Sequence, residues 1–206
     1  VADIGAGTGK LSKELLAHGL EVHAVEPNDA MRELGIKNTL GKSATWHAGT
    51  GEHTGLSDAT YAAVLFGSSF NVVDQAVALK EVARILQPDG FFSCMWDHRD
   101  LDDPVQNDIE TYIKSQISSY SYGERRTDPS KHIEKSGLFE SPKKYEGSFV
   151  ALISKPDIVE AWLSHATLSR QAGAKFTSVV AGIEKILPDG DLLVPYTTRA
   201  WVAQRK

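Results

Sequence analysis

Cysteine is almost absent from this sequence: Cys94 is its one example among 206 residues. A single thiol excludes an intramolecular disulfide framework and favours a reducing compartment such as the cytoplasm. No apolar run approaches the roughly 20 residues that a membrane-spanning helix needs, and no secretory signal peptide is visible. An excess of positive charge is also missing, because 22 Lys and Arg stand against 27 Asp and Glu, a net charge of −5. The sequence therefore predicts a cytoplasmic globular protein with neither nucleic acid nor membrane as a partner.

The first half of the chain alternates short apolar runs with helical patterns, which is typical of βαβ units and a parallel sheet. We expect strands at 1–4, 21–25, 44–48, 61–66 and 91–96, and Asn28 and Asp74 as helix N-caps. A polar, serine-rich stretch follows Asp97, and residues 99–140 are interpreted either as an exposed helix and loop or as a substrate lid. Beyond it the pattern predicts a strand at 149–153, helices at 156–168 and 176–187, and late antiparallel pairing at 192–203.

Glycines at positions 5, 7 and 9 lie between the first strand and the first helix, where backbone amides and a helix N-terminus can meet a ligand. A Walker A loop would need glycine where Ile4 stands and Ser or Thr where Leu11 stands. The dinucleotide fingerprint G-x-G-x-x-G would need glycine where Lys10 stands. The loop therefore disfavours both of these phosphate-binding motifs.

Two acidic residues flank this loop. Asp3 lies in the strand before it, where a carboxylate would repel a pyrophosphate and attract an ammonium or sulfonium group. Glu26 ends the second strand, where a carboxylate can accept hydrogen bonds from both hydroxyls of a ribose. Together they predict a nucleoside with a cationic tail, a description that S-adenosylmethionine fits.

Residues 1–11 followed by 25–32 resemble motif I and the adjoining segment of class I S-adenosylmethionine-dependent methyltransferases. Further similarities follow in the family's order. They are Gly51-Glu52, Gly67-Ser68-Ser69-Phe70 at the end of the fourth strand, and the E-x-x-R-x-L-x-P-x-G pattern of Glu81, Arg84, Leu86, Pro88 and Gly90. The resemblance covers residues 1 to 98 and is closest to the small-molecule (type 11) branch, which includes trans-aconitate and ubiquinone or menaquinone methyltransferases.

The resemblance implies an α/β fold with a doubly wound, mostly parallel seven-stranded sheet and an antiparallel last strand. It also implies one methyltransferase domain over residues 1–206 that lacks the helical segment which family members carry before motif I. The expected reaction is direct transfer of a methyl group to the O, N or C nucleophile of a small-molecule acceptor. The expected cofactor-binding residues are Asp3, Gly5, Ala6, Gly7, Thr8, Gly9, Glu26, Pro27, Met31, Gly51, Glu52, Phe66, Gly67 and Ser68.

Several of these residues also have structural interpretations. Met31 either packs in a core at helical spacing or lines the adenine slot, and Glu52 taken alone is a solvated charge. Asn71 stands where family members often carry histidine and can still make a hydrogen bond to the acceptor. His98 follows the fifth strand and is either a general base or a structural imidazole. Tyr120 and Tyr122 are further candidates that an exposed loop explains without chemistry.

Two other functions stay open at this point. A methyltransferase-like module could bind the nucleoside, or have lost it, and serve to bind a partner. A nicotinamide-dependent oxidoreductase is disfavoured by Lys10. The seven histidines show no H-E-x-x-H and no zinc-site spacing, so no metal is expected. The sequence does not indicate an oligomeric state.

Overall fold

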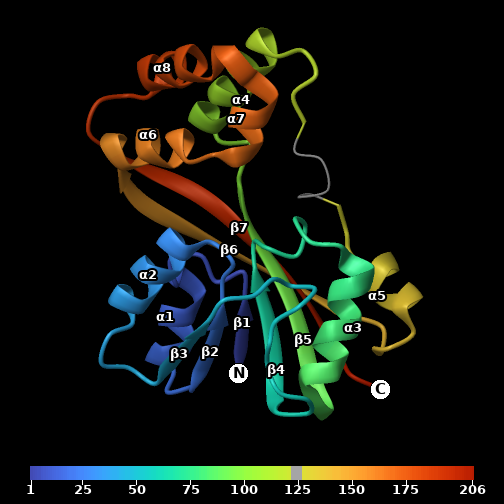
Figure 1. Cartoon of the computed structure of the whole chain (residues 1–206). Coiled ribbons are helices and arrows are strands. Elements are labelled where there is room, and N and C mark those ends of the chain that lie inside the picture. The colour runs from blue at the N-terminus through green and yellow to red at the C-terminus, as the bar shows by residue number, and fades with distance from the viewer. Residues whose placement is uncertain (122–126) are drawn as a thin grey trace. The chain divides into compact units, whose positions relative to one another are not determined.

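A seven-stranded sheet in the order β3-β2-β1-β4-β5-β7-β6 organises the chain in the computed structural model, which describes residues 1–121 and 127–206 (Figure 1). The strands are β1 (Ala2–Ile4), β2 (Val22–Val25), β3 (Ala44–His47), β4 (Tyr61–Gly67), β5 (Leu86–Arg99), β6 (Lys143–Ser154) and β7 (Asp191–Gln204). β3, β2, β1, β4 and β5 pair in parallel, whereas β5–β7 and β7–β6 are antiparallel. The predicted fold class is confirmed.

Helices alternate with strands from β1 to β3 and around α3, whereas β4 follows β3 directly and helices come in succession beyond β5. The helices are α1 (Lys10–Ala17), α2 (Asp29–Asn38), α3 (Gln75–Ile85), α4 (Pro104–Gln116), α5 (Ser130–Ser136), α6 (Lys155–Leu163), α7 (Ala166–Ala172) and α8 (Phe176–Ile186). The two predicted caps are confirmed, because Asn28 accepts a hydrogen bond from the Met31 amide and Asp74 accepts from the amides of Ala76 and Val77.

The chain divides into two compact units. Unit 1 contains Val1–Trp96, Thr127–Tyr145 and Arg199–Lys206, and unit 2 contains Asp97–Arg126 and Glu146–Thr198. The proposed lid at 99–140 therefore falls partly in each unit. Every residue expected to bind the cofactor belongs to unit 1.

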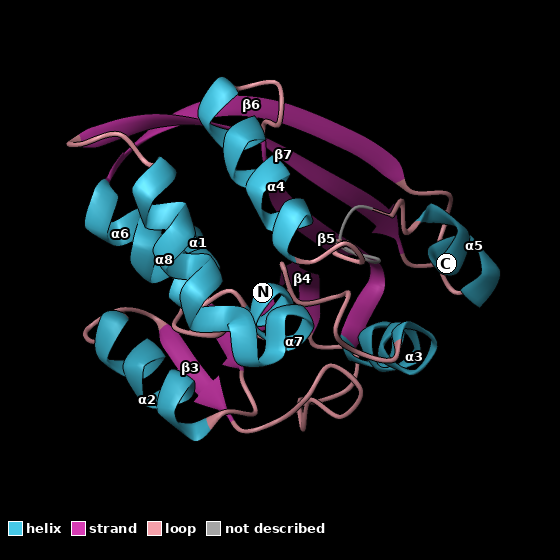
Figure 2. Cartoon of the chain, turned by 90° about the horizontal axis from the view of Figure 1, so that it is seen from above, coloured by secondary structure: helices cyan, strands magenta, loops and turns pink. Residues whose placement is uncertain are grey.

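An aromatic cluster forms the centre of unit 1. Phe66, Phe70 and Phe92 are fully buried, with ring centroids 5.1 to 5.9 Å apart. α3 covers this core with its apolar side chains, among them Leu79 and Val82, and α5 lies beside α3 (Figure 2). A core of this size holds the carboxyl ends of β1, β2 and β4 in fixed places.

The core of unit 2 is built around α8. Its buried side chains Val179, Val180 and Ile183 belong to one apolar cluster with α4, α6 and α7, which contribute Ile109, Trp162 and others. Within residues 1–121 and 127–206, no helix is long and apolar enough to cross a bilayer.

Two predicted elements differ from the structure. The expected helix at 156–168 is wrong as one element: α6 ends at Leu163, and a new helix begins because the His165 side chain accepts a hydrogen bond from the Leu168 amide. The fifth strand is longer than predicted at both ends. Leu86 pairs with Tyr61 while Phe91 pairs with Ala63, so residues 87–90 form a bulge within β5.

Candidate cofactor-binding site

The glycine loop joins β1 to α1 through three left-handed residues. The φ angles are +67° at Gly5, +58° at Gly7 and +82° at Gly9, a region that side chains other than glycine rarely adopt. The amides of Gly5 and Ala6 donate to the Val25 carbonyl over 2.8 and 3.0 Å, which ties the loop to β2. The loop is therefore fixed by the sheet and does not depend on a ligand for its shape.

The three glycines meet different surroundings. A Cβ at Gly5 would lie 2.5 Å from the Ser69 Cβ, and one at Gly9 would lie 3.1 Å from the Trp46 ring. A Cβ at Gly7 would have no atom of the described residues within 4 Å. Gly5 and Gly9 thus allow close packing, whereas Gly7 presents bare backbone to open space, where a ligand could approach it.

Glu26 is buried beside Gly7, at the end of β2. Its Oε2 accepts a hydrogen bond from the Gly7 amide and its Oε1 accepts from the Asn28 amide, both over 2.9 Å. An ionised carboxylate has about four acceptor positions, so two donors leave capacity for ligand hydroxyls. The side chain is therefore oriented in advance for a ligand that approaches over Gly7.

Asp3 is an acid of the site whose hydrogen bonding is incomplete. It is 1% exposed, and Ser12 Oγ donates to its Oδ2 over 2.6 Å. Its Oδ1 is buried and has no hydrogen-bond partner among the described residues. Burial raises the pKa of Asp3 to about 6, against the lowering effect of the Ser12 hydrogen bonds. A buried carboxylate oxygen without a donor is costly, and a ligand cation or donor would remove that cost.

Gly51 and Glu52 lie in the segment after β3 and pack against the residues that precede α3. A Cβ at Gly51 would lie 2.8 Å from Val73 Cγ1, and Glu52 Oε1 accepts a hydrogen bond from the Asp74 amide over 2.7 Å. Burial opposes the charge of Glu52, yet its hydrogen bonds outweigh burial and lower the pKa. Glu52 is thus a partly exposed charge that the Asp74 amide orients.

The end of β4 reaches the same edge of the sheet. Ser69 Oγ donates to the Ile4 carbonyl over 2.5 Å and so joins β4 to β1. Ser68 is exposed, with φ +63°, and its amide donates to the Met95 carbonyl. Phe66 is fully buried in the aromatic cluster, so its place in this structure is that of a core residue.

Pro27 and Met31 lie around the start of α2, and Thr8 of the glycine loop lies beside the end of that helix. Met31 is 48% exposed, so the interpretation of Met31 as a core residue is wrong. Pro27 is exposed, and the Thr8 carbonyl accepts a hydrogen bond from Asn38 over 2.9 Å. Met31 therefore remains available to a ligand.

The two candidates for catalysis lie in different units. Asn71 belongs to unit 1, and its Oδ1 accepts a hydrogen bond from the Trp96 indole over 2.9 Å. His98 lies near the end of β5 in unit 2, so its catalytic role stays a prediction. Tyr120 is buried in the unit 2 core, contrary to the exposed loop expected there, and Tyr122 lies outside the described residues.

Sequence reasoning missed two residues of the site. Ser12 holds Asp3, and Trp46 packs beneath Gly9 and donates to Thr39 over 3.0 Å. A polar residue next to Leu11 on an otherwise apolar helix face was the available signal for Ser12. In unit 2, a cavity of about 330 Å³ between α6 and α8 contains none of the expected site residues. Over the described parts of the chain, no cluster of three or more His, Cys, Asp or Glu could hold a metal ion.

The sheet order and the glycine loop between β1 and α1 are those of an α/β domain of the Rossmann-like class. Residues 2–94 match the family model described as "Methyltransferase domain". Solved structures share the fold. A protein of Anaeromyxobacter dehalogenans, assigned provisionally as a type II methyltransferase, superposes with a TM-score of 0.65 at 17% identity over 98% of this chain and 88% of that one.

Other known proteins are similar in sequence or structure. An uncharacterized methyltransferase of Mycobacterium tuberculosis is 40% identical over 48% of this chain and 40% of its own length. A ubiquinone/menaquinone biosynthesis C-methyltransferase of Zymomonas mobilis is 32% identical over 46% of this chain and 41% of its own length. The chain thus spans less than half of these relatives. A phosphoethanolamine N-methyltransferase of Haemonchus contortus, solved with S-adenosylhomocysteine, has a TM-score of 0.56 at 16% identity, covering 98% of this chain and 48% of that one.

Proposed function

We propose that this protein transfers a methyl group from S-adenosylmethionine to a small-molecule acceptor. The observation that carries the proposal is a pair of carboxylates held on either side of the open backbone at Gly7. Asp3 has a buried Oδ1 with no partner in residues 1–121 and 127–206, and Glu26 is hydrogen-bonded to Gly7. A nucleoside with a cationic tail satisfies both acids at once, because hydroxyls donate to one and positive charge approaches the other.

Each part of the cofactor has residues suited to it. Glu26 accepts from the ribose hydroxyls, and Asp3 faces the cationic methionine portion beside Gly7. The Gly51 amide and the Glu52 carboxylate contact the adenine edge, and the exposed side chain of Met31 covers a face of the ring. Bound there, S-adenosylmethionine supplies an electrophilic methyl group on a cationic sulfur, and its transfer to the acceptor leaves S-adenosylhomocysteine.

The protein's own contribution to the reaction is orientation. Aligning the acceptor nucleophile with the methyl carbon in a site shielded from water lowers the barrier by several kcal/mol without any protein nucleophile. Asn71 can position an acceptor through its amide NH₂ group, since its Oδ1 already accepts from Trp96. The similarity to a quinone-pathway methyltransferase supports a small-molecule acceptor.

Calorimetry with S-adenosylhomocysteine tests the cofactor assignment. We expect Glu26→Gln and Asp3→Asn each to weaken binding at least tenfold, because each removes a charge-assisted contact. Glu21→Gln is the matched control: it removes an exposed acid at the opposite end of β2 and leaves affinity unchanged. Indifference to both site variants would overturn the assignment.

A second experiment separates the enzyme from a non-catalytic binding module that uses the same site. The protein is incubated with S-adenosylmethionine labelled in its methyl group and with a panel of carboxylate, phenol, amine and quinol acceptors. Transfer of label to one acceptor supports the enzyme. Binding without transfer to any of these classes supports the module.

A further inference from the structure

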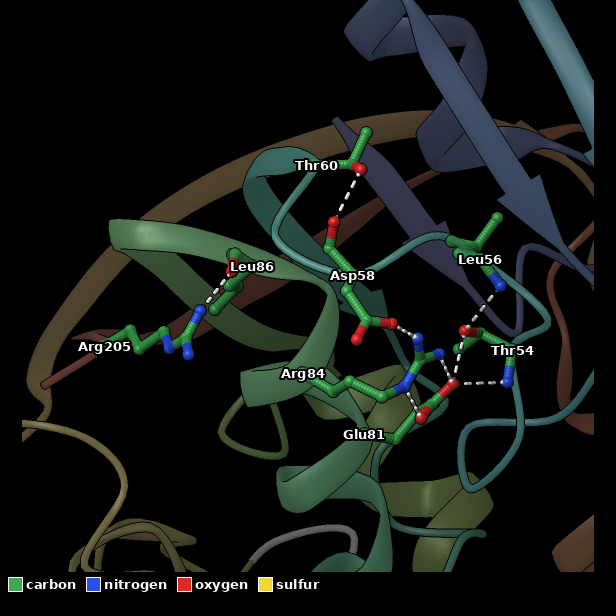
Figure 3. A network of polar contacts seen from close by, with 8 residues as sticks. All are labelled: Thr54, Leu56, Asp58, Thr60, Glu81, Arg84, Leu86 and Arg205. Atoms are coloured by element: carbon green, nitrogen blue, oxygen red, sulfur yellow. Dashed lines mark hydrogen bonds and ion pairs between the residues drawn. The ribbon is translucent and has the colours of Figure 1, made fainter.

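A polar network joins the segment after Glu52 to α3 (Figure 3). Glu81 Oε1 on α3 accepts from Thr54 twice, over 2.9 Å from its amide and 2.6 Å from its hydroxyl. Thr54 is fully buried, and its Oγ1 in turn accepts from the Leu56 amide over 3.2 Å. One carboxylate oxygen on α3 therefore fixes the course of the chain through Thr54.

Arg84 holds Glu81 in the orientation that this contact needs. Arg84 Nε donates to Glu81 Oε2 over 2.8 Å and Arg84 Nη2 donates to Glu81 Oε1 over 2.7 Å, which makes a bidentate pair. Arg84 Nη1 forms an ion pair with Asp58. These hydrogen bonds from Arg84, against the effect of burial, lower the pKa of Glu81 to about 2. The Glu81 carboxylate is thus ionised at neutral pH and is held in one orientation.

The anchored segment is continuous with the proposed adenine contact. Glu52 lies two residues before Thr54, and its carboxylate accepts a hydrogen bond from the Asp74 amide at the start of α3. Gly51 packs against Val73 without space for a Cβ. The Gly51–Thr54 segment is therefore tied to α3 at two places, by Asp74 at the first turn and by Glu81 farther along the helix.

We propose that Glu81 is a positioning residue for nucleoside binding: by holding Thr54, it keeps Gly51 and Glu52 where they meet the adenine ring. This inference rests on the proposed function, which places adenine at these two residues. Glu81 makes no contact with the ligand. Its effect is on recognition of the base, because a displaced Glu52 carboxylate no longer accepts from the adenine 6-amino group.

Base selectivity distinguishes positioning from a purely structural role. S-adenosylhomocysteine carries the 6-amino group, whereas S-inosylhomocysteine has an oxygen in its place, which the Glu52 carboxylate would repel. Lower stability alone does not change the ratio of the two dissociation constants in protein that is still folded. The ratio is measured by calorimetry on the full chain, at a temperature where circular dichroism shows every variant folded.

Three variants and one control make the test. Thr54→Val removes the hydroxyl with little change of shape, and Glu81→Gln removes the charge that orients it. We expect each to weaken S-adenosylhomocysteine binding about fivefold, the size of one hydrogen bond, and to reduce the selectivity ratio similarly. Thr54→Ser keeps the hydroxyl and restores both values. Asp58→Asn, which breaks only the outer ion pair of Arg84, leaves both unchanged.

Hydrogen exchange of the ligand-free protein supplies a readout that needs no cofactor. Amides 52–54 should exchange faster in Thr54→Val and Glu81→Gln than in the wild type and in Asp58→Asn. Wild-type binding with an unchanged selectivity ratio in both variants would overturn the inference and leave the proposed function standing. Failure of the wild type to bind S-adenosylhomocysteine would overturn both.

Discussion

Ser12 Oγ donates to Asp3 Oδ2 over 2.6 Å and so satisfies one oxygen of a buried acid while the other has no partner among the described residues. Burying the Asp3 carboxylate with one oxygen unpaired costs free energy in the ligand-free protein, where the pKa of Asp3 is raised to about 6. The acid at the centre of the candidate site is thus unfavourable for folding and favourable for a cationic ligand.

Asp3→Asn should therefore raise stability and lower affinity together. At pH 7.5 the raised pKa of Asp3 corresponds to a cost on the order of 3 kcal/mol, which the neutral amide relieves in part. We expect the free energy of unfolding in urea to rise by about 1 to 2 kcal/mol. The same variant should bind S-adenosylhomocysteine at least tenfold more weakly. A variant that is both less stable and a weaker binder would contradict this account.

Ligand affinity should depend on pH through the same group. Asp3 keeps its proton in the ligand-free protein until the pH rises through about 6, whereas a bound cation favours the ionised form. Binding of S-adenosylhomocysteine should tighten by about tenfold between pH 5 and pH 7 and then level off. In Asp3→Asn the affinity should be flat over this range, and calorimetry in two buffers should show proton release only for the wild type.

The glycines of the loop should respond differently to alanine. Gly5→Ala combines an unfavourable φ with a Cβ 2.5 Å from Ser69, so we expect a loss of stability of about 3 kcal/mol or more. Gly7→Ala should lose roughly 1 to 2 kcal/mol of stability, because alanine is disfavoured at the positive φ of this position. The new methyl group would also lie where the ligand approaches. Thermal unfolding should rank Gly5→Ala as the less stable, and affinity measured on folded protein should fall for Gly7→Ala. Equal stability of the two variants would argue against the packing described.

Acid should weaken the β2–β3 pair through two histidines. His23 Nδ1 lies 3.1 Å from His47 Nε2 with nearly parallel rings, and Glu21 and Tyr61 are their other titratable neighbours. Burial, together with the charge of His23, lowers the pKa of His47. Because the folded protein lowers the pKa of His47, the unfolded chain binds a proton more readily. The contribution of neutral His47 to the free energy of unfolding is therefore complete above pH 6.5 and is lost as the pH falls below that value.

The His47→Gln variant isolates that effect. Urea unfolding at several values between pH 5 and pH 7.5 should give a smaller acid loss of stability for the variant than for the wild type. The comparison is best made in an Asp3→Asn background, since Asp3 contributes with the opposite sign below pH 6. Parallel profiles of variant and parent would refute the role of the pair.

Local signals in the sequence predicted local structure well. Asn28 and Asp74 cap the helices that they precede because a cap depends on three or four neighbouring residues. The glycine spacing and the two flanking acids were equally readable, since both lie at the ends of short strands. The break at Ser164 and His165 was missed because its cap is a histidine, which is not among the residues that usually cap a helix.

Contacts between distant residues could not be predicted in the same way. Glu81 and Thr54 are 27 positions apart, and nothing in either neighbourhood indicates that α3 returns to the segment after β3. The exposure of Met31 and the burial of Tyr120 also depend on tertiary packing, which hydrophobic spacing alone does not determine. The resemblance to a family predicts which residues bind the cofactor, and the structure shows which contacts hold those residues in place.

The unpartnered oxygen of Asp3 also bears on how long the protein persists in a cell. A ligand that binds only the folded state stabilises it by mass action, most of all where the empty state carries a removable penalty. Proteases act on the fraction that unfolds, so resistance to degradation should follow the supply of the nucleoside.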